Sequence, residues 1–215
     1  LSGSTKFVVG GVDGVTGSEA VNFNYDTILN LETSFTGEDL LVTSLRAGSF
    51  DSGPFSSEAL LETAYGSDDA LKINRNYYTF PIGGDLTATV GAVVRQDDLL
   101  AVWPSVYPAT SGLDVLTYAG APAAYNLSLG SGAGVSYAKD GFSASLAYVA
   151  TNGDDASKGI MTDEGADDIT GQVAYTGDGY GAALAYTVSD DKSGDYDAFG
   201  ISGYWTPSEV GAVPS

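Results

Sequence analysis

A chain of 215 residues without cysteine or histidine excludes disulfides, thiolate or imidazole metal sites, and the Ser-His-Asp and Cys-His arrangements of catalysis. Its 28 acidic and 8 basic residues give a formal net charge of −20, which would repel nucleic-acid phosphates, so we expect no DNA or RNA partner. Hydrophobic residues make up 43% of the chain, which argues against disorder.

A long strand is predicted near residues 20–35, where polar and apolar residues alternate strictly from Val21 to Phe35. Phe23 and Leu29 lie on its apolar face, and Asn24 and Asn30 on its polar face. Strands of soluble domains usually have about 5–6 residues, so fifteen alternating residues are themselves informative. The pattern predicts a long strand with one apolar and one polar face.

The same alternation continues to the end of the chain. It predicts ten strands, near 5–12, 20–35, 40–50, 70–80, 86–96, 127–137, 142–149, 169–175, 180–188 and 197–206. Tight turns are predicted at 37–39, 82–85, 139–141 and 177–179, and longer connections near 13–19, 51–69, 97–126, 150–168 and 189–196. Short and long connections therefore alternate, which is typical of bacterial membrane barrels with short periplasmic turns and long outer loops.

Aromatic residues gather at the predicted short turns, on the apolar faces of the strands. They are Phe35, Phe80, Tyr137, Phe142, Tyr175 and Tyr180. Aromatic rings at one height on a barrel wall form an interfacial girdle, and a soluble β-sandwich has no reason to place them at one end. The sequence therefore predicts an all-β, transmembrane antiparallel β-barrel, in which Val90, Val94 and Leu146 point outward like Phe23 and Leu29.

The chain contains three arginines, and they fall on three successive predicted strands. The alternation places Arg46 and Arg95 on the polar, lumen-facing side. Arg75 is expected to join them, because an arginine facing lipid costs about 2–4 kcal/mol at the middle of the membrane. This choice turns three polar neighbours outward, which fits only a wall at a subunit interface: Lys72, Asn74 and Asn76.

The longest connection, 97–126, is too apolar for a free outer loop, and we expect it to fold inward and narrow the pore. Its acidic side chains would then lie near the arginines and create a transverse field that selects ions. The predicted pore-lining residues are Arg46, Arg75, Arg95, Asp97, Asp98 and Asp114. The alternative is that the arginines are unrelated salt-bridge partners. We predict no catalytic residue and no cofactor. The acidic stretch 154–168 matches no calcium loop, so we predict no metal ligand either.

Three stretches resemble cyanobacterial outer-membrane porins of the carbohydrate-selective, OprB-like group, often labelled iron-uptake porins. They are residues 74–81, 95–108 and 117–122, and the resemblance extends over essentially the whole chain. It implies a barrel of about sixteen strands, a homotrimer in the outer-membrane lipid, and an inward-folded loop between the fifth and sixth strands. It also implies a signal peptide, a peptidoglycan-binding S-layer-homology domain and a coiled coil ahead of the barrel.

The sequence and the resemblance together predict that residues 1–215 are part of a single porin barrel domain, cut at both ends. Ten strands are then expected to form an open, curved wall. The expected function is passive diffusion of small hydrophilic solutes, carbohydrates and inorganic ions, and not catalysis. The alternative is a structural protein that tethers the outer membrane to peptidoglycan through a missing N-terminal domain.

Overall fold

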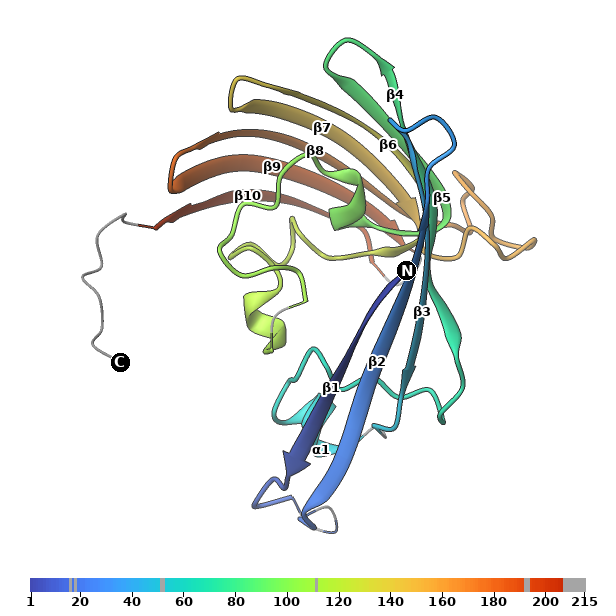
Figure 1. Cartoon of the computed structure of the whole chain (residues 1–215), viewed down its shortest axis with the longest axis vertical. Helices are drawn as coiled ribbons and strands as arrows, with labels where there is room; N and C mark the ends of the chain where they lie inside the picture. The colour runs from blue at the N-terminus through green and yellow to red at the C-terminus, as the bar shows by residue number, and fades with distance from the viewer. Residues whose placement is uncertain (16, 18, 51–52, 111, 192–193, 207–215) are drawn as a thin grey trace.

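The computed structural model describes residues 1–206 except 16, 18, 51–52, 111 and 192–193. Ten strands form one antiparallel sheet in chain order (Figure 1). They are β1 Ser2–Gly10, β2 Asn22–Thr33, β3 Leu40–Gly48, β4 Lys72–Gly83, β5 Leu86–Arg95, β6 Leu129–Lys139, β7 Phe142–Ala150, β8 Ala166–Gly177, β9 Tyr180–Asp191 and β10 Tyr196–Trp205. The short helices are α1 Pro54–Ser57, η1 Gln96–Leu99 and η2 Asp114–Leu116.

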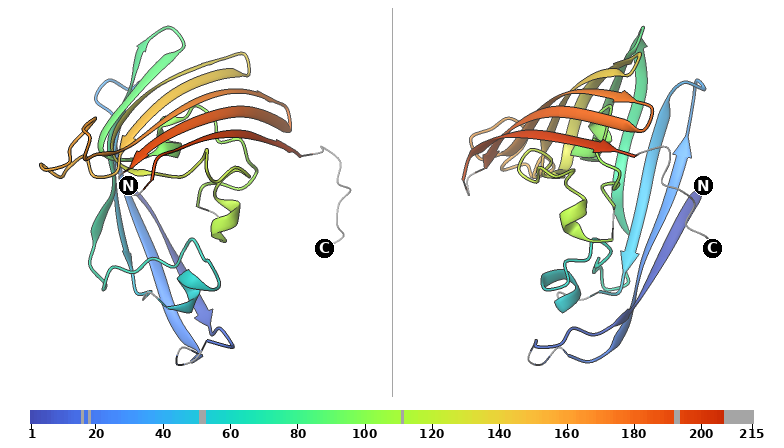
Figure 2. Two further views of the ribbon diagram at one scale, coloured as in Figure 1. Left: turned by 180° about the vertical axis from the view of Figure 1, so that it is seen from behind. Right: turned by 90° about the vertical axis from the view of Figure 1, so that its left-hand side faces the viewer.

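The sheet is open and strongly curved, with β1 and β10 at its two edges. Figure 1 and Figure 2 show one concave side, into which two connections fold, and one convex side. The predicted open wall of ten strands is therefore confirmed. Among the described residues, no helix is both long and apolar enough to cross a membrane.

The convex face carries exposed apolar side chains in place of a closed core. Phe23, Leu29, Val90 and Leu146 are 67%, 38%, 46% and 55% exposed, which confirms their predicted outward direction. Successive side chains of a strand point to opposite faces, so the intervening polar and small residues face the concave side.

Short connections lie between β2 and β3, β4 and β5, β6 and β7, and β8 and β9, as predicted. Asp140 and Gly141 show why one is so short, because both adopt a positive φ (51° and 83°), as a two-residue hairpin turn requires. The predicted loop at 189–196 was too long, since the backbone pairs with β8 as far as Asp191. This loop and those at 13–19, 51–69 and 97–126 lie partly outside the described residues.

Four of the six aromatic residues predicted at the short turns lie in two pairs at the short-turn rim. The rings of Tyr137 and Phe142 lie 6.2 Å apart, and those of Tyr175 and Tyr180 lie 6.3 Å apart. At the first short turn the Asp39 carboxylate accepts hydrogen bonds from the Tyr78 hydroxyl and from backbone amides. These bonds, led by that of Tyr78, lower the pKa of Asp39.

A β-bulge in β4 changes which side chains face inward. Ser44 of β3 pairs with Arg75, but the next residue, Leu45, pairs with Ile73, so that Asn74 is an extra residue. One inserted residue shifts the alternation of side chains along the bulged strand.

Because of the bulge, two of the three side chains predicted to point outward lie on the concave side instead. Lys72 lies opposite Arg46, on the concave side, and Asn74 lines the same concave groove as Arg75. Asn76 pairs with Thr43 and lines a convex groove, as predicted. Strict counting along the strand failed because a bulge has no clear signal in a single sequence.

A second bulge, between β5 and β6, turns Val94 to the concave side, although the alternation predicted it outward. Val94 is completely buried, in a cluster with Leu99, Ala147 and Val149. Leu99 belongs to η1, so the bulge packs the end of β5 against the connection that follows it.

The connection between β5 and β6 lies on the concave side, beneath β6–β10 (Figure 1). Tyr125 is fully buried against Ala185 of β9, and its ring lies 5.2 Å from that of Trp103. The connection between β3 and β4, which contains α1, also lies on the concave side, nearer β1–β3 (Figure 2).

Candidate functional site

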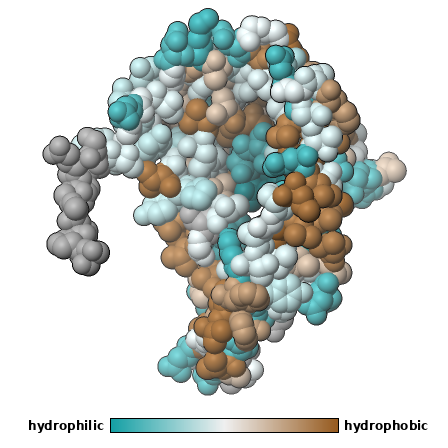
Figure 3. Space-filling view, in the orientation of Figure 1, coloured by the Kyte–Doolittle hydropathy of each residue, from teal (hydrophilic) through white to brown (hydrophobic). Residues whose placement is uncertain are grey.

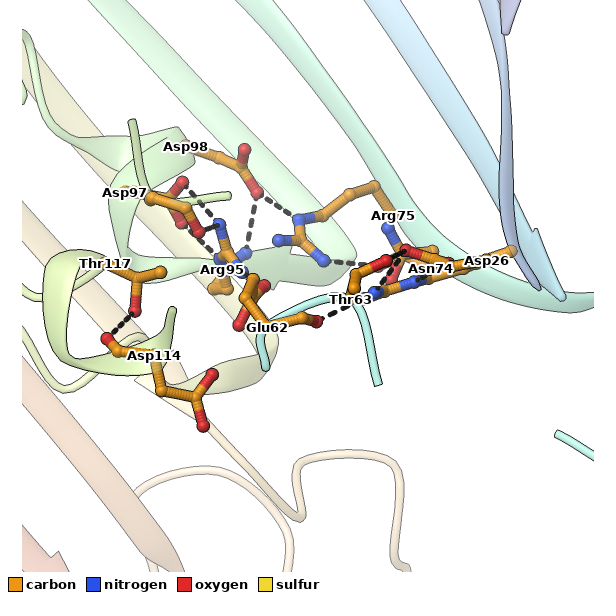
Figure 4. Close-up of polar contacts among 12 residues, drawn as sticks. Asp26, Glu62, Thr63, Asn74, Arg75, Arg95, Asp97, Asp98, Asp114 and Thr117 are labelled. Atoms are coloured by element: carbon orange, nitrogen blue, oxygen red, sulfur yellow. Dashed lines mark hydrogen bonds and ion pairs between the residues drawn. The ribbon is translucent and has the colours of Figure 1, made fainter. Parts of the chain in front are cut away.

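The charged side chains of the concave face gather where β3, β4 and β5 meet the two inner connections. Figure 3 shows hydrophilic residues in this hollow. Arg46, Arg75 and Arg95 line one cavity of about 30 Å³, together with Lys6 and Glu62. The structure thus brings the three predicted arginines together. Figure 4 shows Arg75 and Arg95 beside Asp97, Asp98 and Glu62.

Arg46 joins the wall to the connection between β3 and β4. Its Nε lies 2.7 Å from Asp26 Oδ1 and its Nη2 2.9 Å from Asp26 Oδ2, and Asp26 is only 1% exposed. Arg46 Nη2 also donates to the Glu62 carbonyl oxygen (3.2 Å), and Thr63 Oγ1 donates to Asp26 Oδ2 (3.2 Å). The guanidinium stacks on Tyr65 at 4.4 Å. These contacts fix residues 62–65 against β2 and β3.

Arg75 and Arg95 hold the start of the connection between β5 and β6. Arg75 Nε lies 2.6 Å from Asp98 Oδ2, which also accepts the Arg95 amide at 2.9 Å. Arg95 binds Asp97 through Nε (2.6 Å) and Nη2 (2.9 Å), and its Nη2 donates to the Ala109 carbonyl oxygen (3.1 Å). Because Asp97 and Asp98 come two and three residues after Arg95, η1 is clamped to the wall as soon as β5 ends.

The arginines are neutralised by contact. Arg46, Arg75 and Arg95 form ion pairs with four carboxylates: Asp26, Glu62, Asp97 and Asp98. Positive and negative groups touch here instead of facing each other across an open gap, which differs from the predicted transverse field. The alternative that the arginines are salt-bridge partners fits this geometry, but they form one connected cluster.

Glu62 links the remaining predicted residue, Asp114, to the arginines. Its Oε1 lies 3.8 Å from Arg95 Nη1. Burial raises the pKa of Glu62 to about 7, against the lowering effect of Arg95 and Arg46, and Asp114 raises it further as a hydrogen-bond partner and by its charge. Asp114 thus lies beside Glu62 at the edge of the cluster.

Gln96 fastens the other side of the long connection to the wall. Its buried Nε2 donates to the Ala124 carbonyl oxygen (2.9 Å) and to Thr170 Oγ1 (2.6 Å), and its Oε1 accepts the Leu127 amide (3.2 Å). Thr187 Oγ1 donates to the same Ala124 carbonyl (2.7 Å). The connection is therefore fixed at both ends by side chains of the sheet.

A groove of about 270 Å³ stays open between η1 and the concave face of β2–β4. Polar and charged side chains form much of its lining: Asn30, Glu32, Ser44, Arg75, Arg95 and Asp97. Such a surface can hydrate an ion or hydrogen-bond a small hydrophilic solute. Within the part of the chain that the structure describes, no three or more acidic side chains are arranged to hold a metal ion.

Sequence reasoning missed Asp26, Glu62 and Gln96. Asp26 had a signal, because it lies on the polar face of its strand and pairs with Gly48, two residues beyond Arg46 on the neighbouring strand. Glu62 had none, since its position depends on how a long connection folds back.

No family model matches the chain, and no curated protein matches it. Two solved structures, both mutants of Rhodobacter blastica porin, are similar. One with a single introduced tryptophan has 17% identity and a TM-score of 0.49, over 94% of this chain and 68% of that one. One with two introduced tryptophans has 16% identity and a TM-score of 0.50, over 95% of this chain and 70% of that one. The protein is therefore an all-β antiparallel sheet with the fold of a porin β-barrel wall.

Proposed function

We propose that this chain forms part of an outer-membrane porin through which small hydrophilic solutes and inorganic ions diffuse passively. The observation that carries the proposal is the contrast between the two faces of one sheet. The convex face exposes apolar side chains and an aromatic rim, which suit lipid and its interface. The concave face gathers charges around an open groove.

The groove between η1 and β2–β4 is the proposed path of the solute, and residues 97–126 are the proposed constriction loop within a single porin domain. Arg75, Arg95, Asp97 and Asp98 would line the path directly. Arg46 and Asp114 would act from the sides, through Asp26 and Glu62. This arrangement supports a pore whose narrowest part carries paired charges.

Single-channel recording in planar bilayers tests the function. We expect stepwise, ohmic conductance, and a protein that inserts but shows no steps would refute the proposal. Replacing Arg46, Arg75 and Arg95 with Ala should raise cation preference, because four carboxylates lose their partners, and most strongly at low salt, where screening is weak.

Reversal potentials under a salt gradient would measure the change. Lys139→Ala is the control, since it removes a cation from an exposed ion pair at the short-turn rim. A triple variant with the selectivity of the wild type would show that the arginines only hold the connections in place.

The convex wall of β4–β6 supports a homotrimer. A groove of about 560 Å³ lies there, with the polar side chain of Asn76 beside small residues: Gly91, Ala92, Gly132 and Ala133. A polar group facing lipid is costly, and small residues let two protein surfaces approach closely. Ala133→Trp should therefore dissociate the oligomer on native gels. Ala182→Trp, on the convex face of β9, should leave it intact.

The resemblance to cyanobacterial porins predicts carbohydrates among the solutes and attachment to peptidoglycan through a domain outside this chain. Liposome-swelling rates with sugars of increasing size would test the first prediction. The alternative function, a structural tether, would be favoured if the full-length protein bound isolated peptidoglycan but gave no conductance.

A further inference from the structure

The two inner connections touch each other through a short antiparallel bridge. Leu61 of the β3–β4 connection pairs with Leu113 of the β5–β6 connection. The Glu62 amide donates to the Gly112 carbonyl oxygen (3.3 Å), and the Asp114 amide donates to the Leu60 carbonyl oxygen (2.9 Å). These two bonds flank the leucines, which makes Leu61 and Leu113 a closely spaced, non-hydrogen-bonded pair.

The bridge places two carboxyl groups side by side. Glu62 and Asp114 each follow a bridge leucine, so their side chains leave the bridge on the face opposite the leucines, as diagonal neighbours within reach of each other. Each carboxyl belongs to a different connection. Attraction or repulsion between the two carboxyl groups therefore acts on the contact between the two connections.

The charged groups around Glu62 cannot fully compensate two ionised carboxyls. Arg95 of β5 and Arg46 of β3 face it, and Tyr118 lies near it on the long connection. Both guanidiniums already hold a carboxylate by two bonds each, Arg46 that of Asp26 and Arg95 that of Asp97. Arg75 and Lys6 line the same cavity, and Arg75 holds Asp98. Four cations thus meet five carboxyls, which are Asp26, Glu62, Asp97, Asp98 and Asp114.

We propose that Glu62 and Asp114 share one proton and thereby form a pH-operated clasp between the two inner connections. With the proton bound, a carboxyl–carboxylate hydrogen bond closes the clasp. Without it, two neighbouring negative charges repel each other, and the bridge at Leu61 and Leu113 opens. The proposal rests on the channel function above, because an open clasp would widen the path between the connections.

The direction of the pH dependence follows from burial. The pKa of Glu62 is raised from its ordinary 4.5 to about 7, mainly because burial disfavours its charged form. A raised pKa in the closed state means that the clasp is fully stabilised below about pH 4.5 and loses this stabilisation as the pH rises through about 7. Acid should close the clasp and alkali should open it.

A distance measurement tests the clasp without any need for conductance. The chain has no cysteine, so spin labels can be attached to Leu60→Cys and Val115→Cys, exposed positions on the two connections. In lipid vesicles we expect a shorter interlabel distance at pH 5.5 than at pH 8.5. Glu62→Gln should keep the short distance at both values, because its amide can donate to Asp114. Glu58→Gln, the same charge change in the same connection, should respond like the wild type.

Channel recording forms the second arm. The conductance step should be larger at pH 8.5 than at pH 5.5, with a transition near pH 7 that Glu62→Gln abolishes. A disulfide between Leu61→Cys and Leu113→Cys, whose close pairing favours such a bond, should hold the acid conductance at both pH values until it is reduced.

The distance measurement and the channel recording together distinguish failure of the channel function from failure of the clasp. Absence of steps at every pH would overturn the channel function, while the interlabel distance would still decide the clasp. An interlabel distance equal at both pH values, a Glu62→Gln variant that responds like the wild type, or steps of pH-independent size would each overturn the clasp.

Discussion

The two halves of the concave face are built from different residues. The half formed by β1–β4 carries long charged side chains: Lys6, Asp26, Arg46, Lys72 and Arg75. The half formed by β7–β10 carries small, buried ones: Ser145, Ala147, Thr170, Ala185 and Ser202. The long connection packs on the second half, and the groove stays open against the first. The side chains of the wall are therefore small where they support the long connection and charged beside the open groove.

The close approach of the long connection to the sheet explains why the side chains of this half are small. A Cβ on Gly200 of β10 would lie 2.8 Å from the Ala124 Cβ, and on the adjoining strand β6 one on Gly134 would lie 3.0 Å from the Leu99 Cβ. Side chains larger than these would push the connection away from the sheet. On this half, hydrogen bonds and packing position the connection, whereas on the charged half ion pairs do.

The largest effect is expected on the charged half. Asp26→Ala removes the buried carboxylate that holds Arg46, and should lower the free energy of unfolding by about 3–5 kcal/mol, as for one partner lost from a buried pair. Urea unfolding in lipid vesicles would measure it. Asp154→Ala, at an exposed loop position, is the control and should change it by less than about 0.5 kcal/mol. Equal values would mean that ion pairs do not hold this half.

An intermediate effect is expected from overfilling the small half. Ala185→Leu places a larger side chain against buried Tyr125 and should cost about 1–3 kcal/mol. It should also make residues 97–126 more susceptible to protease, because the connection is pushed off the wall. Ala182→Leu, on the convex face of the same strand, should do neither. Similar proteolysis of both variants would contradict the division between the halves.

The smallest effect is expected from removing the two hydrogen bonds of one hydroxyl group on the small half. Thr187→Val removes the bonds to the Ala124 carbonyl oxygen and to Thr170, and should cost about 1 kcal/mol. The cost stays small because Gln96 still donates to both groups. Thr43→Val on β3 is the control, and unfolding in the same vesicles is the measurement. A cost well above 2 kcal/mol would show that Thr187 anchors the connection more than Gln96 does.

The sequence by itself determined the strands, the rim of short turns and the outward apolar face. Each depends on local chemistry: alternation at period 2, glycine and aspartate in tight turns, and aromatic rings beside them. The positions of Phe23 and Leu146 could be predicted for this reason. So could Asp97 and Asp98 beside the arginines, because they follow Arg95 in the chain.

Only the tertiary structure decided the bulge at Asn74, the inward turn of Val94, the partner of each arginine and the meeting of Glu62 with Asp114. Each depends on contacts between segments that lie far apart in the chain. A bulge shifts every side chain after it, and a connection folded back on a wall can place its carboxyls anywhere along that wall. The protonation of Glu62 depends on burial, which exists only after both connections have folded inward.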